Sequence, residues 1–104
     1  MNKDIEYIFN NKVYNITKST LLYEYIDREP TGMKFMGQYP MTREFTIRVY
    51  KSSRGNLYRA EIRNDRISIS DITKEEFIGL LARRSELGLL RELYPETANR
   101  LEEV

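Results

Sequence analysis

EFTIRVYK (44–51), NLYRAEIR (56–63) and RISIS (66–70) are three stretches in which apolar and polar residues alternate, and the turn sequences SSRG and ND separate them. Alternation with a period of two is typical of strands with one buried face, and glycine or Asn-Asp between two such strands is typical of hairpin turns. The sequence therefore predicts a three-stranded antiparallel meander from Glu44 to Ser70.

The two turns predict a register for this meander. Pairing Lys51 with Asn56 sets the first hairpin, and pairing Arg63 with Arg66 sets the second. Both choices gather the apolar residues on one face, and a slip of one residue would move a strand's apolar set to the other face. The predicted core face consists of Phe45, Ile47, Val49, Tyr58, Ala60, Ile62, Ile67 and Ile69.

The opposite face of the predicted meander is rich in arginine, and we predict that it binds a partner. Its candidate partner-binding residues are Arg48, Arg59, Arg63, Arg66, Tyr50 and Glu61, with Glu44 and Leu57 among them. In this register Arg48 lies opposite Arg59, and such like-charged pairs repel unless an anion or carboxylate lies between them. Three interpretations remain open: a solvated face with weak ion pairs, a surface for an acidic protein, and a surface for nucleic-acid phosphates. Tyr50 with Leu57 could also offer a platform on which bases stack.

The first 43 residues predict further strands and a loop. Residues 5–9 and 13–16 alternate around Asn10-Asn11, and asparagine tolerates the positive φ of a two-residue hairpin turn. Residues 20–26 predict another strand. Residues 27–43 contain two prolines, two glycines and three methionines, which is loop composition, with a short strand around residues 34–36.

The last third of the chain predicts helices. Thr73 can cap a helix over residues 74–84, because Glu76 lies three residues later and can reach back to the cap. Phe77 and Leu81 share a stripe on this helix, which we expect to cover the apolar face of the meander. Residues 85–94 predict a second helix, and Pro95 fits the first turn of a third.

Composition narrows the classes of function. The chain of 104 residues contains neither cysteine nor histidine, so disulfides, thiolate catalysis, histidine bases and ordinary zinc or haem ligands are excluded. We therefore expect a protein that is not an enzyme and needs no cofactor. The length suits a single domain over residues 1–104, and the lack of a long apolar run predicts a cytoplasmic protein without a membrane span.

Charge is distributed unevenly along the chain. Residues 43–70 carry seven basic and three acidic side chains, whereas residues 71–104 carry five basic and eight acidic ones. A homodimer in which the acidic end of one chain lies on the basic sheet face of another is one use of this asymmetry.

Four motifs resemble a known group of proteins. They are KVYNITKSTLLYEY (12–25), RVYKSSRGNLYRAEI (48–62), ISDITKEEFIGLL (69–81) and LRELYPETANRLEE (90–103). In this order they resemble small proteins encoded by phages and integrative elements of Firmicutes, with departures at residues 15–17 and 56–58. Some proteins of such elements look like anti-CRISPR proteins, which bind a CRISPR nuclease stoichiometrically. The resemblance implies a host protein or ribonucleoprotein as partner and supplies no catalytic residue.

These observations together predict an α+β protein. We expect an antiparallel sheet of five or six strands packed against C-terminal helices, with residues 1–70 mostly in strands and residues 73–104 helical. The expected function is that of a non-enzymatic mobile-element protein that binds and inhibits a host macromolecule, most concretely a type II CRISPR nuclease. The alternative is a small nucleic-acid-binding protein that uses the basic sheet face.

Overall fold

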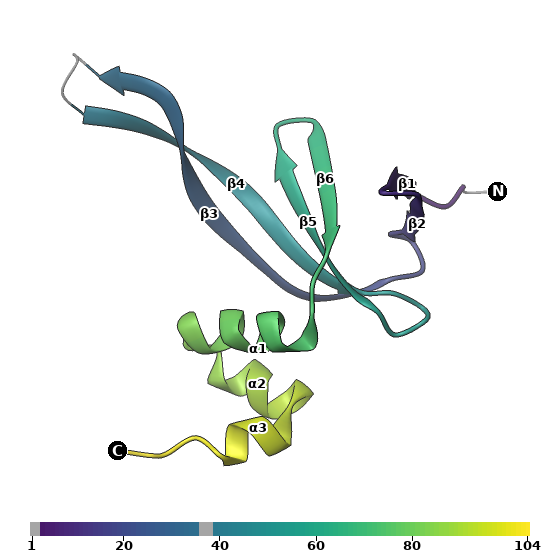
Figure 1. Ribbon diagram of the computed structural model, residues 1–104, viewed down its shortest axis with the longest axis vertical. Helices are drawn as coiled ribbons and strands as arrows, with labels where there is room; N and C mark the ends of the chain where they lie inside the picture. The colour runs from purple at the N-terminus through teal and green to yellow at the C-terminus, as the bar shows by residue number, and fades with distance from the viewer. Residues whose placement is uncertain (1–2, 36–38) are drawn as a thin grey trace. The chain divides into compact units, whose positions relative to one another are not determined.

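The computed structural model describes residues 3–35 and 39–104, and the side chains of these residues outside 33–40. The chain forms two compact units, of which the first ends at Asp71 and the second begins at Ile72. The described part of the first unit has a four-stranded and a two-stranded antiparallel sheet, and the second unit has three helices (Figure 1). The predicted α+β class is confirmed.

The first hairpin forms where the sequence predicts it. Strands β1 (Glu6–Phe9) and β2 (Lys12–Asn15) pair antiparallel, with Tyr7 opposite Tyr14. Asn10 and Asn11 connect them with φ angles of 51° and 62°. Two consecutive positive φ angles match the twist of the flanking strands, which is why two asparagines close this turn.

The larger sheet has the strand order β3-β4-β5-β6. Its strands are β3 (Thr20–Phe35), β4 (Tyr39–Lys51), β5 (Leu57–Arg63) and β6 (Arg66–Asp71). The predicted meander is confirmed as β4, β5 and β6. Figure 1 shows that β3 and β4 extend well past the ends of β5 and β6.

The extension of β3 and β4 is a two-stranded ribbon, because β4 pairs with β5 only from Thr46 onward. We name residues 27–35 and 39–45 the β3–β4 arm. The prediction of a loop over residues 27–43 is wrong for the described residues of this range, and the part of the predicted short strand at Met36 lies outside them. The strand accommodates the turn-forming residues at a register shift between Pro30 and Lys34, where Gly32 has a φ of +83°.

The register of the meander is partly as predicted. Arg63 pairs with Arg66, which confirms the second turn. The first hairpin is shifted by one residue, so that Tyr50 lies opposite Tyr58 and the predicted pairing of Lys51 with Asn56 is wrong. The loop has five residues, 52–56, because Gly55 has a φ of +87° and the Ser52 amide still donates to the Asn56 carbonyl at 2.8 Å.

This shift gives the sheet two apolar faces where the sequence predicts one. Tyr50, Tyr58, Ala60 and Ile69 are buried on one side, which we name the tyrosine face. The other side, which we name the arginine face, carries the buried residues Phe45, Ile47 and Val49 of β4 beside Arg59, Glu61 and Arg63 of β5. The predicted single core face is therefore wrong, because the central strands bury residues on both sides.

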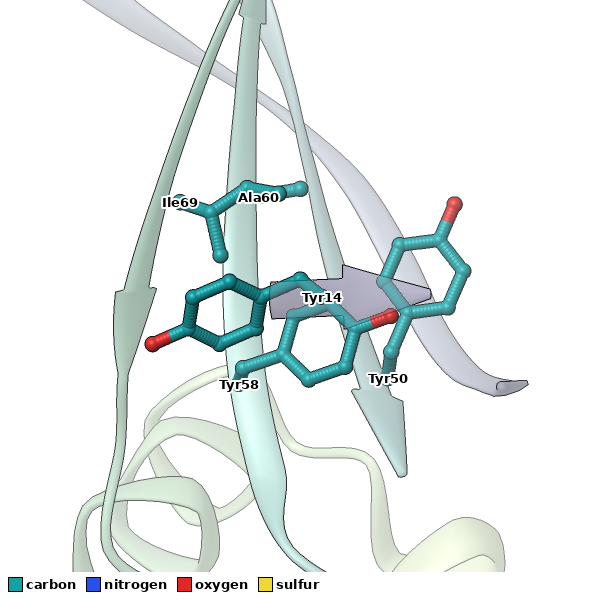
Figure 2. Close-up of a cluster of buried hydrophobic side chains, with 5 residues drawn as sticks. All are labelled: Tyr14, Tyr50, Tyr58, Ala60 and Ile69. Atoms are coloured by element: carbon teal, nitrogen blue, oxygen red, sulfur yellow. The ribbon is translucent and has the colours of Figure 1, made fainter. Parts of the chain in front are cut away.

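A cluster of tyrosines fills the tyrosine face. Tyr14 of the β1–β2 hairpin contacts Tyr58 edge to face at a centroid distance of 5.0 Å, and Tyr50 stacks on Tyr58 at 5.3 Å (Figure 2). The Tyr14 hydroxyl donates to Asp71 Oδ1 at 2.7 Å. Burial, followed by this hydrogen bond, raises the pKa of Tyr14 to about 12. The hairpin thus closes the tyrosine face with aromatic contacts that still satisfy their hydroxyl groups.

The helical unit begins at the predicted cap. Helix α1 (Lys74–Arg83) starts with a complete capping box, in which the Thr73 hydroxyl accepts from the Glu76 amide and the Glu76 carboxylate accepts from the Thr73 amide. Helix α2 (Leu87–Leu93) and helix α3 (Pro95–Asn99) follow, with Pro95 in the first turn of α3 as predicted. None of the helices in the described part of the chain is long and apolar enough to cross a membrane. The packing of α1 on the meander stays a prediction.

Candidate functional site

The predicted arginine patch is divided between the two sides of the sheet. Arg48 lies opposite Ala60 on the tyrosine face, whereas Arg59 lies opposite Val49 on the arginine face. The predicted pairing of Arg48 with Arg59 is therefore wrong. Arg66 lies opposite Arg63, so that Arg59, Glu61, Arg63 and Arg66 share the arginine face. The physical cause is the one-residue shift of the first hairpin. A shift of one residue moves the side chains of β5 to the opposite side of the sheet relative to those of β4.

Tyr50 is part of the core. It is only 7% exposed and stacks on Tyr58. Leu57 lies opposite Lys51, on the other side of the sheet from Tyr50. The predicted stacking platform of Tyr50 and Leu57 is therefore wrong, because the two side chains do not share a face.

Arg48 is held by groups of its own sheet. Its Nε donates to Glu24 Oε1 of β3 at 3.2 Å. A hydrogen bond with Tyr50, followed by the bond with Glu24, raises the pKa of Arg48. A partner that binds Arg48 would have to compete with these two contacts.

A chain of alternating charges crosses the arginine face. We name it the Arg63 network, and its members are Arg43, Glu29, Arg63, Glu61 and Arg59. Arg63 binds Glu29 with two parallel hydrogen bonds, from Nε to Oε1 at 2.7 Å and from the terminal nitrogen to Oε2 at 2.9 Å. The same guanidinium donates to Glu61 Oε2 at 2.8 Å. Bidentate pairs of this kind are the geometrically specific ion pairs of proteins.

Phe45 lies under the centre of this network. Glu29 is on β3 and Arg63 is on β5, so the Arg63 side chain reaches across β4 to meet its partner. Its guanidinium carbon is 4.1 Å from the centroid of the Phe45 ring. Stacking on an aromatic ring fixes the plane of the guanidinium group and leaves its edges free to bind carboxylates. The Arg63 network therefore joins three strands at the base of the β3–β4 arm.

The outer ends of the network are also paired. Arg43 Nε donates to Glu29 Oε1 at 2.8 Å, and Arg59 donates to Glu61 Oε1 at 2.6 Å. Glu44, which the sequence places among the arginines of this face, lies instead on the tyrosine face and pairs with Arg28 of β3 at 3.1 Å. Among the described residues Arg66 has no ion-pair partner, and it is exposed. Of the six candidate residues, Arg66 alone is an exposed cation without a carboxylate beside it in the described structure.

The Arg63 network predicts a pH dependence of stability. Hydrogen bonds from Arg63, and secondarily from Arg43, lower the pKa of Glu29 from 4.5 to about 2. A pKa that is lower in the folded state gives stability that is present above the unfolded pKa and is lost as the pH falls. We expect the free energy of unfolding, measured with urea, to fall more steeply between pH 4.5 and 2 than in the Glu29→Gln variant. Equal slopes for the two proteins would contradict this role of Glu29.

Sequence reasoning missed the residues that complete these contacts. Glu29 and Arg43 lie in the range predicted as a loop, although β3 pairs with β4 without a register shift from Tyr23 to Pro30. Residues 27–30 are three charged residues and a proline, so no alternation of apolar and polar residues past Ile26 could have found them. On the tyrosine face, Ile26, Thr46 and Ile62 line an open hollow of about 220 Å³, which is smaller than ordinary ligand pockets.

The described residues contain no group of three or more acidic side chains that could hold a metal ion. Comparisons with protein-family models, with curated proteins and with solved structures found no match.

Proposed function

We propose that this chain is a non-enzymatic mobile-element protein that binds and inhibits a host macromolecule, and that the β3–β4 arm carries the contact. The observation that supports this most is the arm itself, a ribbon that continues past the ends of β5 and β6 (Figure 1). A ribbon that leaves its sheet presents two faces and two edges to a partner. Main-chain groups at such edges and side chains on the faces can be recognised together.

The charges of the arm favour a protein surface as the partner. Arg28 pairs with Glu44 across the two strands on one face, and Arg43 pairs with Glu29 on the other. Both faces thus present positive and negative groups side by side. Mixed charges of this kind give specificity in protein–protein contacts, where each group meets its opposite.

A phosphate backbone is the less favoured partner. Arg48, Arg59 and Arg63 each bind a carboxylate of their own chain. Nucleic acid would have to displace these carboxylates, whereas binding to phosphates ordinarily relies on free cations that release counterions. The four arginines of the alternative function also do not share one face.

The resemblance to proteins of phages and integrative elements supports a concrete form of this proposal, namely inhibition of a type II CRISPR nuclease. The test measures DNA cleavage by several purified type II nucleases, each loaded with its guide RNA, with and without the full chain. We expect a molar excess of the chain to inhibit one of these nucleases completely. We also expect the chain to copurify with that nuclease. Unimpaired cleavage by all of them would contradict the CRISPR form of the proposal.

A pair of variants tests the role of the arm. Met41 and Arg43 are exposed residues of β4 in the arm, and we expect Met41→Asp combined with Arg43→Glu to weaken inhibition about tenfold or more by placing acidic groups in the contact. Arg54→Glu is the matched control, since Arg54 is exposed in the 52–56 loop outside the arm. Equal inhibition by the arm variant and the control would contradict the role of the arm. Retardation of DNA or RNA at low salt by the chain alone would favour the alternative function.

A further inference from the structure

Strand β3 is an edge of the larger sheet. It pairs with β4 on one side, and in the described structure no strand pairs with its other side. An edge strand of this length, sixteen residues, is a template for another strand. Its backbone directions and its side chains together indicate which strand fits it.

A side-chain contact shows which backbone groups of β3 point outward. The Arg28 amide donates to Oδ1 of the neighbouring Asp27 at 2.8 Å and so points away from β4. In an antiparallel strand the direction alternates with each residue, and the register between Tyr23 and Pro30 has no shift. The amides and carbonyls of Glu24 and Ile26 therefore also point to the free edge. Pro30 occupies an outward position too, where its missing amide hydrogen costs no bond to β4.

The side chains at these outward positions lie on one face. Glu24, Ile26 and Arg28 are opposite Arg48, Thr46 and Glu44 of β4, which places them on the tyrosine face. Ile26 is 59% exposed. Along the strand they present a negative charge, an apolar side chain and a positive charge at equal spacing. Rotation by 180° about Ile26 exchanges the two charges, so this order is complementary to itself.

We propose that β3 pairs antiparallel with β3 of a second copy of this chain, with Ile26 on the two-fold axis. Glu24 of each copy then lies opposite Arg28 of the other, and Ile26 covers its own counterpart. All of these positions exchange backbone hydrogen bonds, because their amides and carbonyls already point outward. The result is a continuous sheet across both copies with an isologous interface.

Neighbouring registers are less favourable. An axis at Asp27 would place Asp27 opposite itself, and an axis at Arg28 would place two arginines together. An axis at Tyr25 would place Glu24 opposite Ile26. Like charges in opposite positions destabilise a strand pair, whereas opposite charges stabilise it. The charges of β3 therefore select the register centred on Ile26.

Contacts within each copy affect the dissociation constant of this dimer. The Asp27 carboxylate must release the Arg28 amide, which then donates to the Glu24 carbonyl of the second copy. Glu24 and Arg28 keep their partners on β4, because a carboxylate accepts several hydrogen bonds and a guanidinium donates several. We therefore expect a dimer that dissociates on dilution. Its measurement, the oligomeric state of the chain alone, does not require the proposed inhibition of a host macromolecule.

Sedimentation velocity of the full chain over a wide range of concentrations tests the proposal. We expect a monomer–dimer equilibrium for the unchanged protein. Glu24→Arg and Arg28→Glu should each weaken dimerisation about tenfold or more, since each variant opposes two pairs of like charges. An equimolar mixture of the two variants should dimerise again, because every opposing pair then has opposite charges. A monomer at all concentrations, or no association of the mixed variants, would overturn the proposal.

A backbone variant tests the strand pairing itself. Ile26→Pro removes an amide hydrogen that does not bond to β4, so we expect the fold, measured by circular dichroism, to be kept and the dimer to be lost. Ile26→Val keeps the amide and should keep the dimer. A dimer that persists in Ile26→Pro would show that the copies associate elsewhere, including through the acidic end of the chain, and would overturn the proposal.

Discussion

Tyr58→Ala is expected to lower the free energy of unfolding of this protein by about 3–5 kcal/mol, as truncation of a large buried aromatic residue does. Tyr58 is 1% exposed and contacts the rings of both Tyr14 and Tyr50 (Figure 2). Its removal leaves a cavity on the tyrosine face and removes the ring contact between Tyr58 and Tyr14 of the β1–β2 hairpin. Urea unfolding followed by circular dichroism measures the loss.

Tyr58→Phe is the matched control for this change. The Tyr58 hydroxyl donates to Ser19 Oγ at 2.6 Å, and Ser19 in turn donates to the Asn15 carbonyl at 2.6 Å. Loss of this hydroxyl with retention of the ring should cost about 1 kcal/mol. Similar losses in Tyr58→Ala and Tyr58→Phe would contradict the view that ring packing stabilises this face.

Ile47→Ala is expected to lower the free energy of unfolding by about 2–5 kcal/mol, and Ile47→Val by about 0.5–1.5 kcal/mol. Ile47 is fully buried on β4, on the arginine face opposite Glu61. The loss grows with the volume removed because close-packed surroundings collapse only in part. The same urea titration measures both variants.

Thr46→Ala provides the comparison at the next residue, which points to the tyrosine face and is half-buried. We expect it to cost less than Ile47→Val. A larger loss for Thr46→Ala than for Ile47→Ala would mean that the arginine face is not a buried face of the sheet. Together, large losses at Tyr58 and Ile47 would show that both faces of the sheet stabilise the fold.

Local patterns predict much of this fold. The alternation in β4, β5 and β6, the positive φ angles of Asn10-Asn11 and the capping box at Thr73 each depend on residues within a few positions of one another. Interactions of this range are encoded in short windows of sequence, since a turn or cap needs specific residues at fixed offsets. The hairpin, the meander and the start of α1 were predicted for this reason.

The arm was missed because its composition contains strong turn formers. Pro30 and Gly32 are ordinarily signals of a loop. In β3 they are accommodated because Pro30 lies on an edge strand and Gly32 at a register shift. Whether a strand is an edge depends on the order of strands in the sheet, which no short window contains.

The candidate site was likewise predicted only in part from the sequence. Its residue types were predicted, since arginine and glutamate alternate along β5, but their partners were not. Glu29 and Arg63 are 34 residues apart in sequence and meet only because β3, β4 and β5 are adjacent in the sheet. The expected basic patch is thereby divided and largely paired with carboxylates.

Local sequence patterns predict the α+β class, the meander, the turn at Asn64-Asp65 and the capped helix, because each follows from periodicity or from contacts between near neighbours. Only the folded structure reveals the register of the first hairpin, the two buried faces, the arm and the pairing of Glu29 with Arg63. One positive φ at Gly55 moves the register by one residue, which reverses side chains between the two faces. The arm and the pairing of Glu29 with Arg63 follow from the order of strands in the sheet, which brings together residues far apart in the sequence.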